Sequence, residues 1–206
     1  MKRAIFLGTF NPPHKGHCDV LQSVIEALPE LEKIYVIPCW QNPNKDKSTP
    51  YDDRYEMCKR QFNSLSNKIT IESIEKWLKP TYTYQLIDYI REVTDDFWWI
   101  VTEETYEELL SGKWKANKIL LAQNKFIIVN FSKSHAEWLS IDYNRAMKEN
   151  RIKHVYLCEG SDVKVHSTQI REMIKEGKDV SAYINEQTEE YIKKRTEEYN
   201  NKNKIF

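Results

Sequence analysis

The chain has 206 residues, of which 31 are basic and 31 are acidic, so its formal net charge is zero. A balanced charge offers no general attraction for nucleic acid or for a membrane surface, and any anion site must be built locally. The length predicts a single domain over residues 1–206, in which residues 180–206 form a C-terminal helix and tail.

The four cysteines lie far apart and form no C-x-x-C pair. This spacing argues against a zinc site and against a disulfide framework. The first residues lead straight into an apolar run and lack a signal-peptide pattern, and no apolar run approaches the length of a membrane span. We therefore expect a cytoplasmic protein.

A ten-residue stretch, Gly8 to His17, connects the first predicted strand to the first predicted helix. Residues 4–7 are apolar and predict a buried strand, and apolar side chains recur at helical spacing between residues 18 and 28. The amino end of a helix has unpaired N–H groups that suit a phosphate. His14 and His17 flank Gly16 there, and both imidazoles can donate hydrogen bonds to a polyphosphate. A packed crossover, or half of a metal site, is the alternative interpretation.

Strands and helices alternate along the rest of the chain. Further strands are expected at residues 34–38, 69–74, 96–101, 125–131 and 154–158. Helices are expected at 51–64, around 86–93, and at 106–110, 136–148 and 168–176. Thr81 or Thr83 is the expected cap of the helix around 86–93. A strand–helix–strand unit makes parallel strands with a right-handed crossover. The pattern predicts an α/β fold with a doubly wound, mostly parallel sheet and a C-terminal helical extension.

A second stretch of interest, residues 165–171, opens the helix that is expected to end before Gly177. Ser167 or Thr168 is expected to cap this helix, so that hydroxyl and N–H groups face an anion. Arg171 follows one turn later and can make forked hydrogen bonds to phosphate oxygens. A capped surface helix with an arginine is the common alternative.

Residues 8–17 resemble the first signature of the His-x-Gly-His nucleotidylyltransferase superfamily, especially the nicotinate or nicotinamide mononucleotide adenylyltransferases. Residues 165–171 are similar to the second signature, Ile-Ser-Ser-Thr-x-Ile-Arg, with His166 in place of the first serine. The match extends from Arg3 to about Arg195. It implies a Rossmann-like nucleotidylyltransferase fold. It also implies transfer of AMP from ATP to a pyridine mononucleotide, with release of pyrophosphate, in NAD biosynthesis.

The same resemblance implies roles for individual residues. His14, His17 and Arg171 would be catalytic. The implied ATP-binding residues are Gly8, Thr9, Phe10, His14, Gly16, His17, Glu104, Ser167, Thr168 and Arg171. The implied mononucleotide-binding residues are Lys45, Tyr82, Thr83 and Trp114. An indole such as that of Trp114 can stack on a cationic pyridine ring. No dedicated metal site is expected, because Mg²⁺ would arrive with ATP.

Besides His166, the junction after the strand at 96–101 departs from the family pattern. Glu104 stands where the family has an aspartate, and Thr102 stands where it has a glycine. Three other functions remain open: a nucleotidylyltransferase with a phosphopantetheine or alcohol-phosphate acceptor, a non-catalytic nucleotide sensor, and a fragment of a class I aminoacyl-tRNA synthetase. The short, neutral chain disfavours the synthetase. The sequence leaves open the choice between acid and amide substrates and between a monomer and a homo-oligomer.

Overall fold

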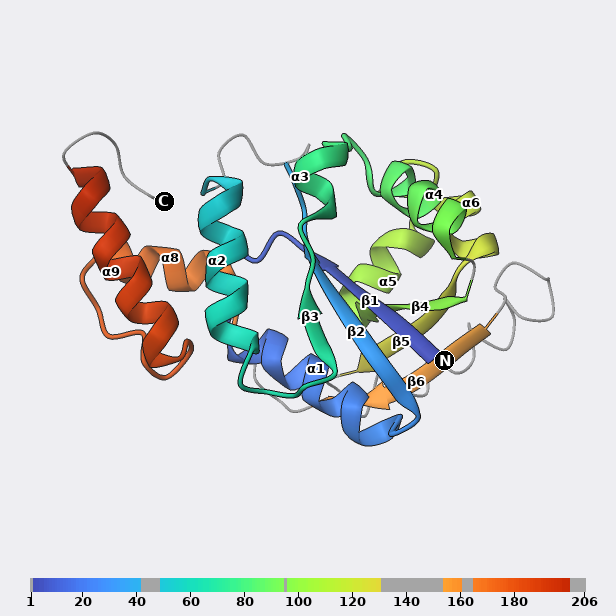
Figure 1. Cartoon of the computed structure of the whole chain (residues 1–206), viewed down its shortest axis with the longest axis horizontal. Helices are drawn as coiled ribbons and strands as arrows, with labels where there is room; N and C mark the ends of the chain where they lie inside the picture. The colour runs from blue at the N-terminus through green and yellow to red at the C-terminus, as the bar shows by residue number, and fades with distance from the viewer. Residues whose placement is uncertain (1, 42–48, 95, 131–153, 161–164, 201–206) are drawn as a thin grey trace.

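The computed structural model describes residues 2–41, 49–94, 96–130, 154–160 and 165–200. Within them, six strands form one sheet in the order β3-β2-β1-β4-β5-β6 (Figure 1). Every pairing in the sheet is parallel. The strands are β1 (Lys2–Gly8), β2 (Leu31–Pro38), β3 (Ile69–Ile71), β4 (Phe97–Thr102), β5 (Lys125–Asn130) and β6 (His154–Glu159). The prediction of a doubly wound parallel sheet is therefore confirmed.

Helices cover both faces of this sheet, as Figure 1 shows. Those of the amino-terminal half are α1 (Lys15–Ala27), α2 (Tyr51–Phe62), α3 (Ile74–Leu78) and α4 (Thr83–Val93). Those that follow β4 are α5 (Glu103–Leu110), α6 (Asn117–Gln123), α8 (Ser167–Lys175) and α9 (Glu186–Asn200).

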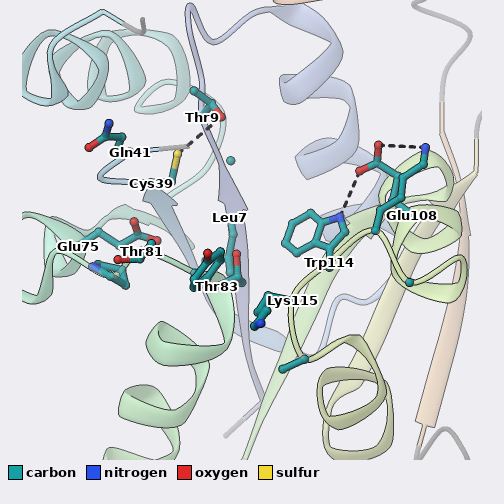
Figure 2. Close-up of a pocket in the computed structure, with 16 residues that line it drawn as sticks. Leu7, Thr9, Cys39, Gln41, Glu75, Thr81, Thr83, Glu108, Trp114 and Lys115 are labelled. Atoms are coloured by element: carbon teal, nitrogen blue, oxygen red, sulfur yellow. Dashed lines mark hydrogen bonds and ion pairs between the residues drawn. The ribbon is translucent and has the colours of Figure 1, made fainter. Parts of the chain in front are cut away.

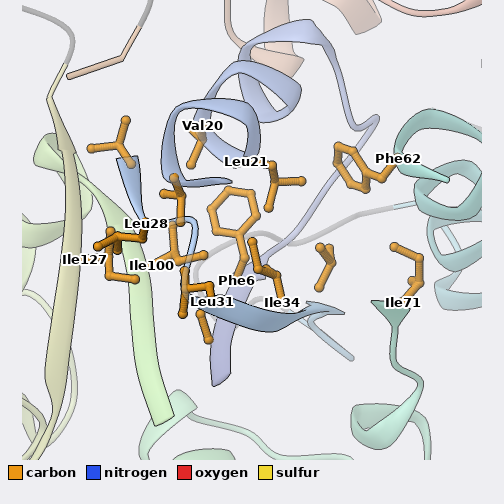
Figure 3. Close-up of a cluster of buried hydrophobic side chains, with 14 of the residues drawn as sticks. Phe6, Val20, Leu21, Leu28, Leu31, Ile34, Phe62, Ile71, Ile100 and Ile127 are labelled. Carbon is orange, nitrogen blue, oxygen red and sulfur yellow. The ribbon is translucent and has the colours of Figure 1, made fainter. Parts of the chain in front are cut away.

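The central strand β1 contributes to a separate apolar core on each face of the sheet. Successive side chains of a strand point to opposite faces. Accordingly, Phe6 packs with Leu21 of α1 and Phe62 of α2 (Figure 3). The neighbouring Ile5 packs on the other face with buried side chains of α4, α5 and α6. Burial on both faces fixes β1 and leaves its carboxyl end as a rigid platform.

The C-terminal helices α8 and α9 pack against α2. Ile170 of α8 and Ile192 of α9 are buried in a third apolar cluster with Met57 of α2. Next to this cluster, the buried carboxylate of Asp53 accepts hydrogen bonds from the Tyr191 hydroxyl (2.8 Å) and from Arg195 Nε (2.7 Å). The predicted C-terminal helical extension is present and is anchored through both apolar and charged contacts.

Strand β3 and helix α6 differ from the prediction by more than a shift at one end. The strand predicted to extend from residue 69 to residue 74 ends at Ile71, and Ile74 instead begins the short helix α3. Helix α6 was not predicted; it begins after Ala116, whose φ of 57° turns the chain into the helix. The helix predicted at 136–148 lies outside the described residues. Across the described part of the chain, no helix has the length and apolar character to cross a membrane.

Candidate active site

Two cavities open at the carboxyl end of β1, which is the point where the strand order of the sheet reverses. Parallel α/β sheets place ligands at this switch point. One cavity, of about 570 Å³, is lined by His14, His17 and the start of α8, and we call it the histidine cavity. The other, of about 560 Å³, is lined by Lys113, Lys115 and the start of α4, and we call it the lysine cavity. The two share four lining residues: Leu7, Gly8, Thr9 and Trp114.

The two histidines of the loop lie against each other at the start of α1. Their ring centroids are 3.8 Å apart, and His14 occupies the N-cap position. The backbone N–H of His14 donates to Nδ1 of His17 at 3.2 Å. Because Nδ1 of His17 accepts this bond, the proton of the neutral ring must sit on Nε2. His17 therefore offers an Nε2–H donor whose tautomer is set by the backbone.

Burial keeps both imidazoles neutral. Burial, reinforced by the nearby His166, lowers the pKa of His14 to about 4. Burial, followed by the proximity of His14, lowers the pKa of His17 well below its ordinary value. At neutral pH, both rings thus act as uncharged hydrogen-bonding groups.

Phe10 holds the shape of the loop. Its φ of 48° lies in the left-handed region, and its side chain is buried. The ring makes edge contacts with His17 (5.0 Å between centroids) and Phe62 (5.7 Å). A Cβ added to Gly8 would lie 2.8 Å from this ring, so only glycine fits there. Since the Phe10 side chain serves packing, its backbone is what remains to face a ligand in the cavity.

The start of α8 is bonded directly to the loop that carries the histidines. The Ser167 hydroxyl donates to the Pro12 carbonyl oxygen at 2.9 Å. The Arg171 guanidinium donates to the Asn11 carbonyl oxygen at 2.8 Å and to the Thr168 hydroxyl at 3.2 Å. Two stretches more than 150 residues apart in sequence therefore meet at one cavity.

The predicted cap of α8 was wrong. The N-cap residue is His166, and Ser167 is the first residue of the helix. The side chain of Gln169 accepts the backbone N–H of His166 at 3.1 Å, and the Ser167 hydroxyl is used to bind the loop. The serine thus anchors the helix to the loop and does not cap it.

The lysine cavity is bounded by Trp114 on one side and by the start of α4 on the other. Figure 2 shows Trp114 across the cavity from Thr81 and Thr83, with Leu7 between them. Glu108 accepts the indole N–H of Trp114 at 3.1 Å and lies 3.7 Å from Lys113 Nζ. The indole is therefore held in place before any ligand arrives.

The predicted cap of α4, Thr81 or Thr83, was also wrong. Tyr82 is the N-cap residue, and the side-chain oxygen of Gln85 accepts the N–H groups of Thr81 (2.8 Å) and Tyr82 (2.9 Å). Those two donors are already used. The N–H groups of Thr83 and Tyr84 belong to the first turn of the helix, where no intrahelical acceptor exists.

Arg54 organises the backbone under both cavities, although a lone arginine on a helix is usually solvent-facing. Its side chain is 1% exposed. It donates 2.9 Å hydrogen bonds to the carbonyl oxygens of Thr9, Trp40 and Thr49. It thereby joins the histidine loop, residues 9–14 between β1 and α1, to both ends of the loop between β2 and α2. In the sequence, Arg54 and Met57 resemble the Arg-x-x-Met string of the family at this helix, but that string does not identify the carbonyl groups that Arg54 binds.

A buried carboxylate, Glu75 of α3, completes this arrangement. It accepts the backbone N–H of Trp40, whose carbonyl group is held by Arg54. Burial raises the pKa of Glu75 to about 7, and the Trp40 hydrogen bond and the Arg54 charge oppose this shift. Glu75 also lines the lysine cavity. Periodicity gave no reason to single it out.

Most of the predicted site residues fall into the two cavities. The histidine cavity is lined by Gly8, Thr9, Phe10, His14, Gly16, His17, Glu104, Ser167 and Thr168. The lysine cavity is lined by Tyr82, Thr83 and Trp114. Arg171 lies beside the histidine loop through its bond to Asn11. Lys45 lies outside the described residues. Thr102, Glu104 and His166, which depart from the family pattern, all line the histidine cavity.

The described residues contain no group of three or more histidine, cysteine, aspartate or glutamate side chains arranged to hold a metal ion. Within the histidine cavity, the carboxylates among the described residues are Glu103 and Glu104 at the start of α5. Its other polar lining residues are threonines, a serine and histidines.

Curated relatives cover nearly the whole chain. The probable nicotinate-nucleotide adenylyltransferase of Clostridium tetani is 31% identical over 193 residues, which cover 91% of this chain and 94% of that protein. The protein of the same name from Fusobacterium nucleatum is 29% identical over 192 residues, with the same coverage of both chains.

Solved structures show the same fold. The nicotinic acid mononucleotide adenylyltransferase of Plasmodium falciparum, complexed with NaAD, aligns with a TM-score of 0.75 at 22% identity. The alignment covers 95% of this chain and 96% of that one. The family model described as cytidylyltransferase-like matches residues 5–200, and the chain belongs to this family.

Proposed function

We propose that this protein transfers AMP from ATP to nicotinate mononucleotide or nicotinamide mononucleotide, giving the dinucleotide and pyrophosphate in NAD biosynthesis. The observation that carries the proposal is the pair of cavities with a common wall at the end of β1. Two nucleotides bound side by side there would bring their phosphates together at Gly8 and Thr9. The names of the curated relatives support the same activity.

The histidine cavity is the proposed ATP site. The Nε2–H of His17 would contact the α-phosphate, and His14 would hold a phosphate oxygen beside it. Backbone groups of Gly8, Thr9 and Phe10 would approach the phosphates, with Gly16 at the start of α1. Glu104 is proposed to contact the nucleoside. The carbonyl oxygens of Pro12 and Asn11 accept hydrogen bonds from Ser167 and Arg171 and so hold the amino end of α8 at the cavity. The amino end of a helix would suit the β- and γ-phosphates.

Arg171 and Thr168 are proposed to contact the leaving pyrophosphate. A guanidinium has five N–H donors, and the described bonds to Asn11 and Thr168 leave others for phosphate oxygens. The hydroxyl proton of Ser167 is committed to Pro12, so we propose that its backbone N–H is the phosphate donor.

The lysine cavity is the proposed mononucleotide site. The indole of Trp114, fixed by Glu108, would stack on the pyridinium ring. The N–H of Thr83 at the start of α4 would bind the carboxylate or carboxamide, with Tyr82 at the rim of the same cavity. Lys45 is proposed to reach the mononucleotide phosphate.

The reaction needs no nucleophile from the protein. An oxygen of the mononucleotide 5′-phosphate attacks the α-phosphorus of ATP and forms the new O–P bond. The bond from the α-phosphorus to the bridging oxygen breaks, and its electron pair leaves with pyrophosphate. Catalysis is then positioning plus stabilisation of the charge that develops on the α-phosphate oxygens, which is the role of His17.

Nucleotidylyltransferases of this kind typically use Mg²⁺ with ATP. A cavity lined by hydroxyls, N–H groups and imidazoles fits an ion that is held mainly by phosphate oxygens and waters. Such an ion would neutralise part of the triphosphate charge.

A pyrophosphate-release assay tests the proposal. Purified protein would receive Mg²⁺ and ATP with nicotinate mononucleotide or nicotinamide mononucleotide in parallel, and with phosphopantetheine and glycerol phosphate as control acceptors. We expect pyrophosphate only with a pyridine mononucleotide, together with a dinucleotide of the corresponding mass. Release only with a control acceptor would identify a different transferase. ATP binding with no release from any acceptor would identify a nucleotide sensor.

A further inference from the structure

We infer that Lys115 is a specificity-determining residue of the mononucleotide site, where its ammonium group pairs with a carboxylate on the pyridine ring and disfavours a carboxamide. The inference rests on the proposed function, because it takes the lysine cavity to be the mononucleotide site. Lys115 directly follows Trp114, the proposed stacking residue, and both line this cavity.

The turn that carries Lys115 is fixed by contacts of the residues around it. The backbone N–H of Asn117 donates to the Trp114 carbonyl oxygen at 3.2 Å, and the Asn117 side-chain amide donates to the Leu109 carbonyl oxygen at 3.0 Å. Ala116, between them, has a φ of 57°, in the left-handed region. The backbone of Lys115 is therefore held in one place relative to the indole, and its side chain starts from the wall of the cavity.

The charged groups of the cavity are balanced except for Lys115. Lys113 lies 3.7 Å from the carboxylate of Glu108, so these two charges offset each other. Glu75 has the cation of Arg54 beside it, which favours its ionised form. Lys115 makes no hydrogen bond or ion pair with any residue that the structure describes. Its ammonium group is thus the cation of this lining that can meet an anionic ligand without breaking a protein contact.

The position of Lys115 selects between the two anionic groups that a pyridine mononucleotide can carry. Figure 2 shows Lys115 and Thr9 toward opposite ends of the cavity, with Leu7 between them. The phosphate of the mononucleotide would lie at the Thr9 end, where the two cavities share a wall. Lys115 would therefore face the other end of the ligand, the pyridine ring and its substituent, which the start of α4 at Thr83 would also contact.

A cation discriminates between the two substituents in a way that the start of α4 does not. A backbone N–H such as that of Thr83 can donate to an oxygen of a carboxylate or of a carboxamide. The ammonium group is attracted by the charge of a carboxylate, and it gains much less from a neutral amide. Because Lys115 is exposed, water and salt weaken this attraction. We therefore expect a moderate effect, a preference for the acid of roughly three- to tenfold from this side chain.

The test compares kcat/KM for nicotinate mononucleotide with kcat/KM for nicotinamide mononucleotide, at saturating Mg²⁺-ATP. Lys115→Met removes the charge, Lys115→Arg keeps it, and Lys115→Glu reverses it. Lys118→Met is the matched control, because it removes an exposed cation of α6 that does not line either cavity. A thermal melt of each variant checks folding.

We expect Lys115→Met to lower the acid-to-amide ratio of kcat/KM by roughly three- to tenfold, through a loss with the acid alone. Lys115→Glu should lower the ratio further, and Lys115→Arg and Lys118→Met should keep it near the wild-type value. The loss in Lys115→Met should also shrink as salt is added.

Two results would overturn the inference while leaving the proposed function in place. An unchanged ratio in Lys115→Met and Lys115→Glu would show that the ammonium group does not sense the substituent. An equal loss with both substrates would place it at the phosphate, which the acid and the amide have in common. Failure of the wild type to release pyrophosphate with either mononucleotide would overturn the proposed function, and the inference with it.

Discussion

At the scale of single residues, the tautomer of His17 is decided by one backbone hydrogen bond. The His14 N–H donates to Nδ1, so Nε2 carries the proton and can donate to a phosphate oxygen. Phe10 packs edge-on against the same ring and limits its rotation. The donor is thus oriented before ATP arrives, and preorganised donors are the ones that stabilise a transition state effectively.

Replacing His17 by alanine should lower kcat by roughly a hundredfold or more, the usual scale for one lost transition-state donor. The fold should persist, since α1 keeps its other contacts. His17→Asn, which retains an N–H donor, is the comparison variant and should lose less. Steady-state kinetics of pyrophosphate release measure the effect, and a thermal melt checks folding. Turnover within a fewfold of wild type in His17→Ala would remove the residue from the mechanism.

The residues that sequence reasoning could identify are those whose motif is local. Gly8, His14, His17 and Arg171 stand in two short strings with specific spacing, and the structure brings these strings to one place. Arg54 and Glu75 were not identifiable in this way. Their importance comes from three carbonyl groups and one N–H group that reach them from other segments of the chain. No periodicity within α2 or α3 encodes those partners.

At the scale of elements, Arg54 connects segments that no strand or helix joins. Through it, α2 holds the histidine loop at Thr9 and both ends of the next loop at Trp40 and Thr49. Buried carbonyl groups that lose their donors cost free energy, and water cannot reach a side chain that is 1% exposed.

Arg54→Met should therefore lower the free energy of unfolding by about 3–5 kcal/mol. The substitution leaves buried carbonyl groups without hydrogen-bond donors, and it leaves Glu75 without its neighbouring cation. Lys59→Met on the same helix is the control. Its side chain is 44% exposed and its ammonium group pairs with Glu56 at 3.3 Å, so the change should stay below about 1 kcal/mol. Urea denaturation measures both variants. If both variants lost the same free energy of unfolding, the hydrogen bonds of Arg54 would contribute no more to stability than the exposed ion pair of Lys59.

Element boundaries were predicted less well than element types, for a physical reason. Strand β3 is at the edge of the sheet and pairs only with residues 34–36 of β2, so its length is set by its partner and not by its own alternating pattern. The caps of α4 and α8 were misplaced for a related reason. In both helices the third residue, Gln85 or Gln169, accepts the N–H of the N-cap residue, and this contact competes with the serine and threonine caps expected from propensity.

At the scale of the whole molecule, the C-terminal extension closes back on the first helix. The backbone N–H of Lys15, the first residue of α1, donates to the Tyr183 carbonyl oxygen at 2.7 Å. Its side chain reaches the Ser181 carbonyl oxygen at 3.2 Å. The histidine loop is therefore held from β1, α2, α8 and the segment before α9. The alternation of strands and helices predicted the sheet, but it did not predict this return of the chain.

The wall common to the two cavities has a kinetic consequence. Leu7, Gly8, Thr9 and Trp114 line both cavities, which under the proposed function the two substrates would occupy as independent molecules. The dinucleotide product would occupy both cavities as one molecule. It would keep the contacts of both substrates, but its binding costs translational and rotational entropy once and not twice. We expect it to leave slowly, and quenched-flow measurements should show a first turnover faster than all later ones. A linear time course from the first milliseconds would mean that bond formation, and not release of the dinucleotide, is rate-limiting.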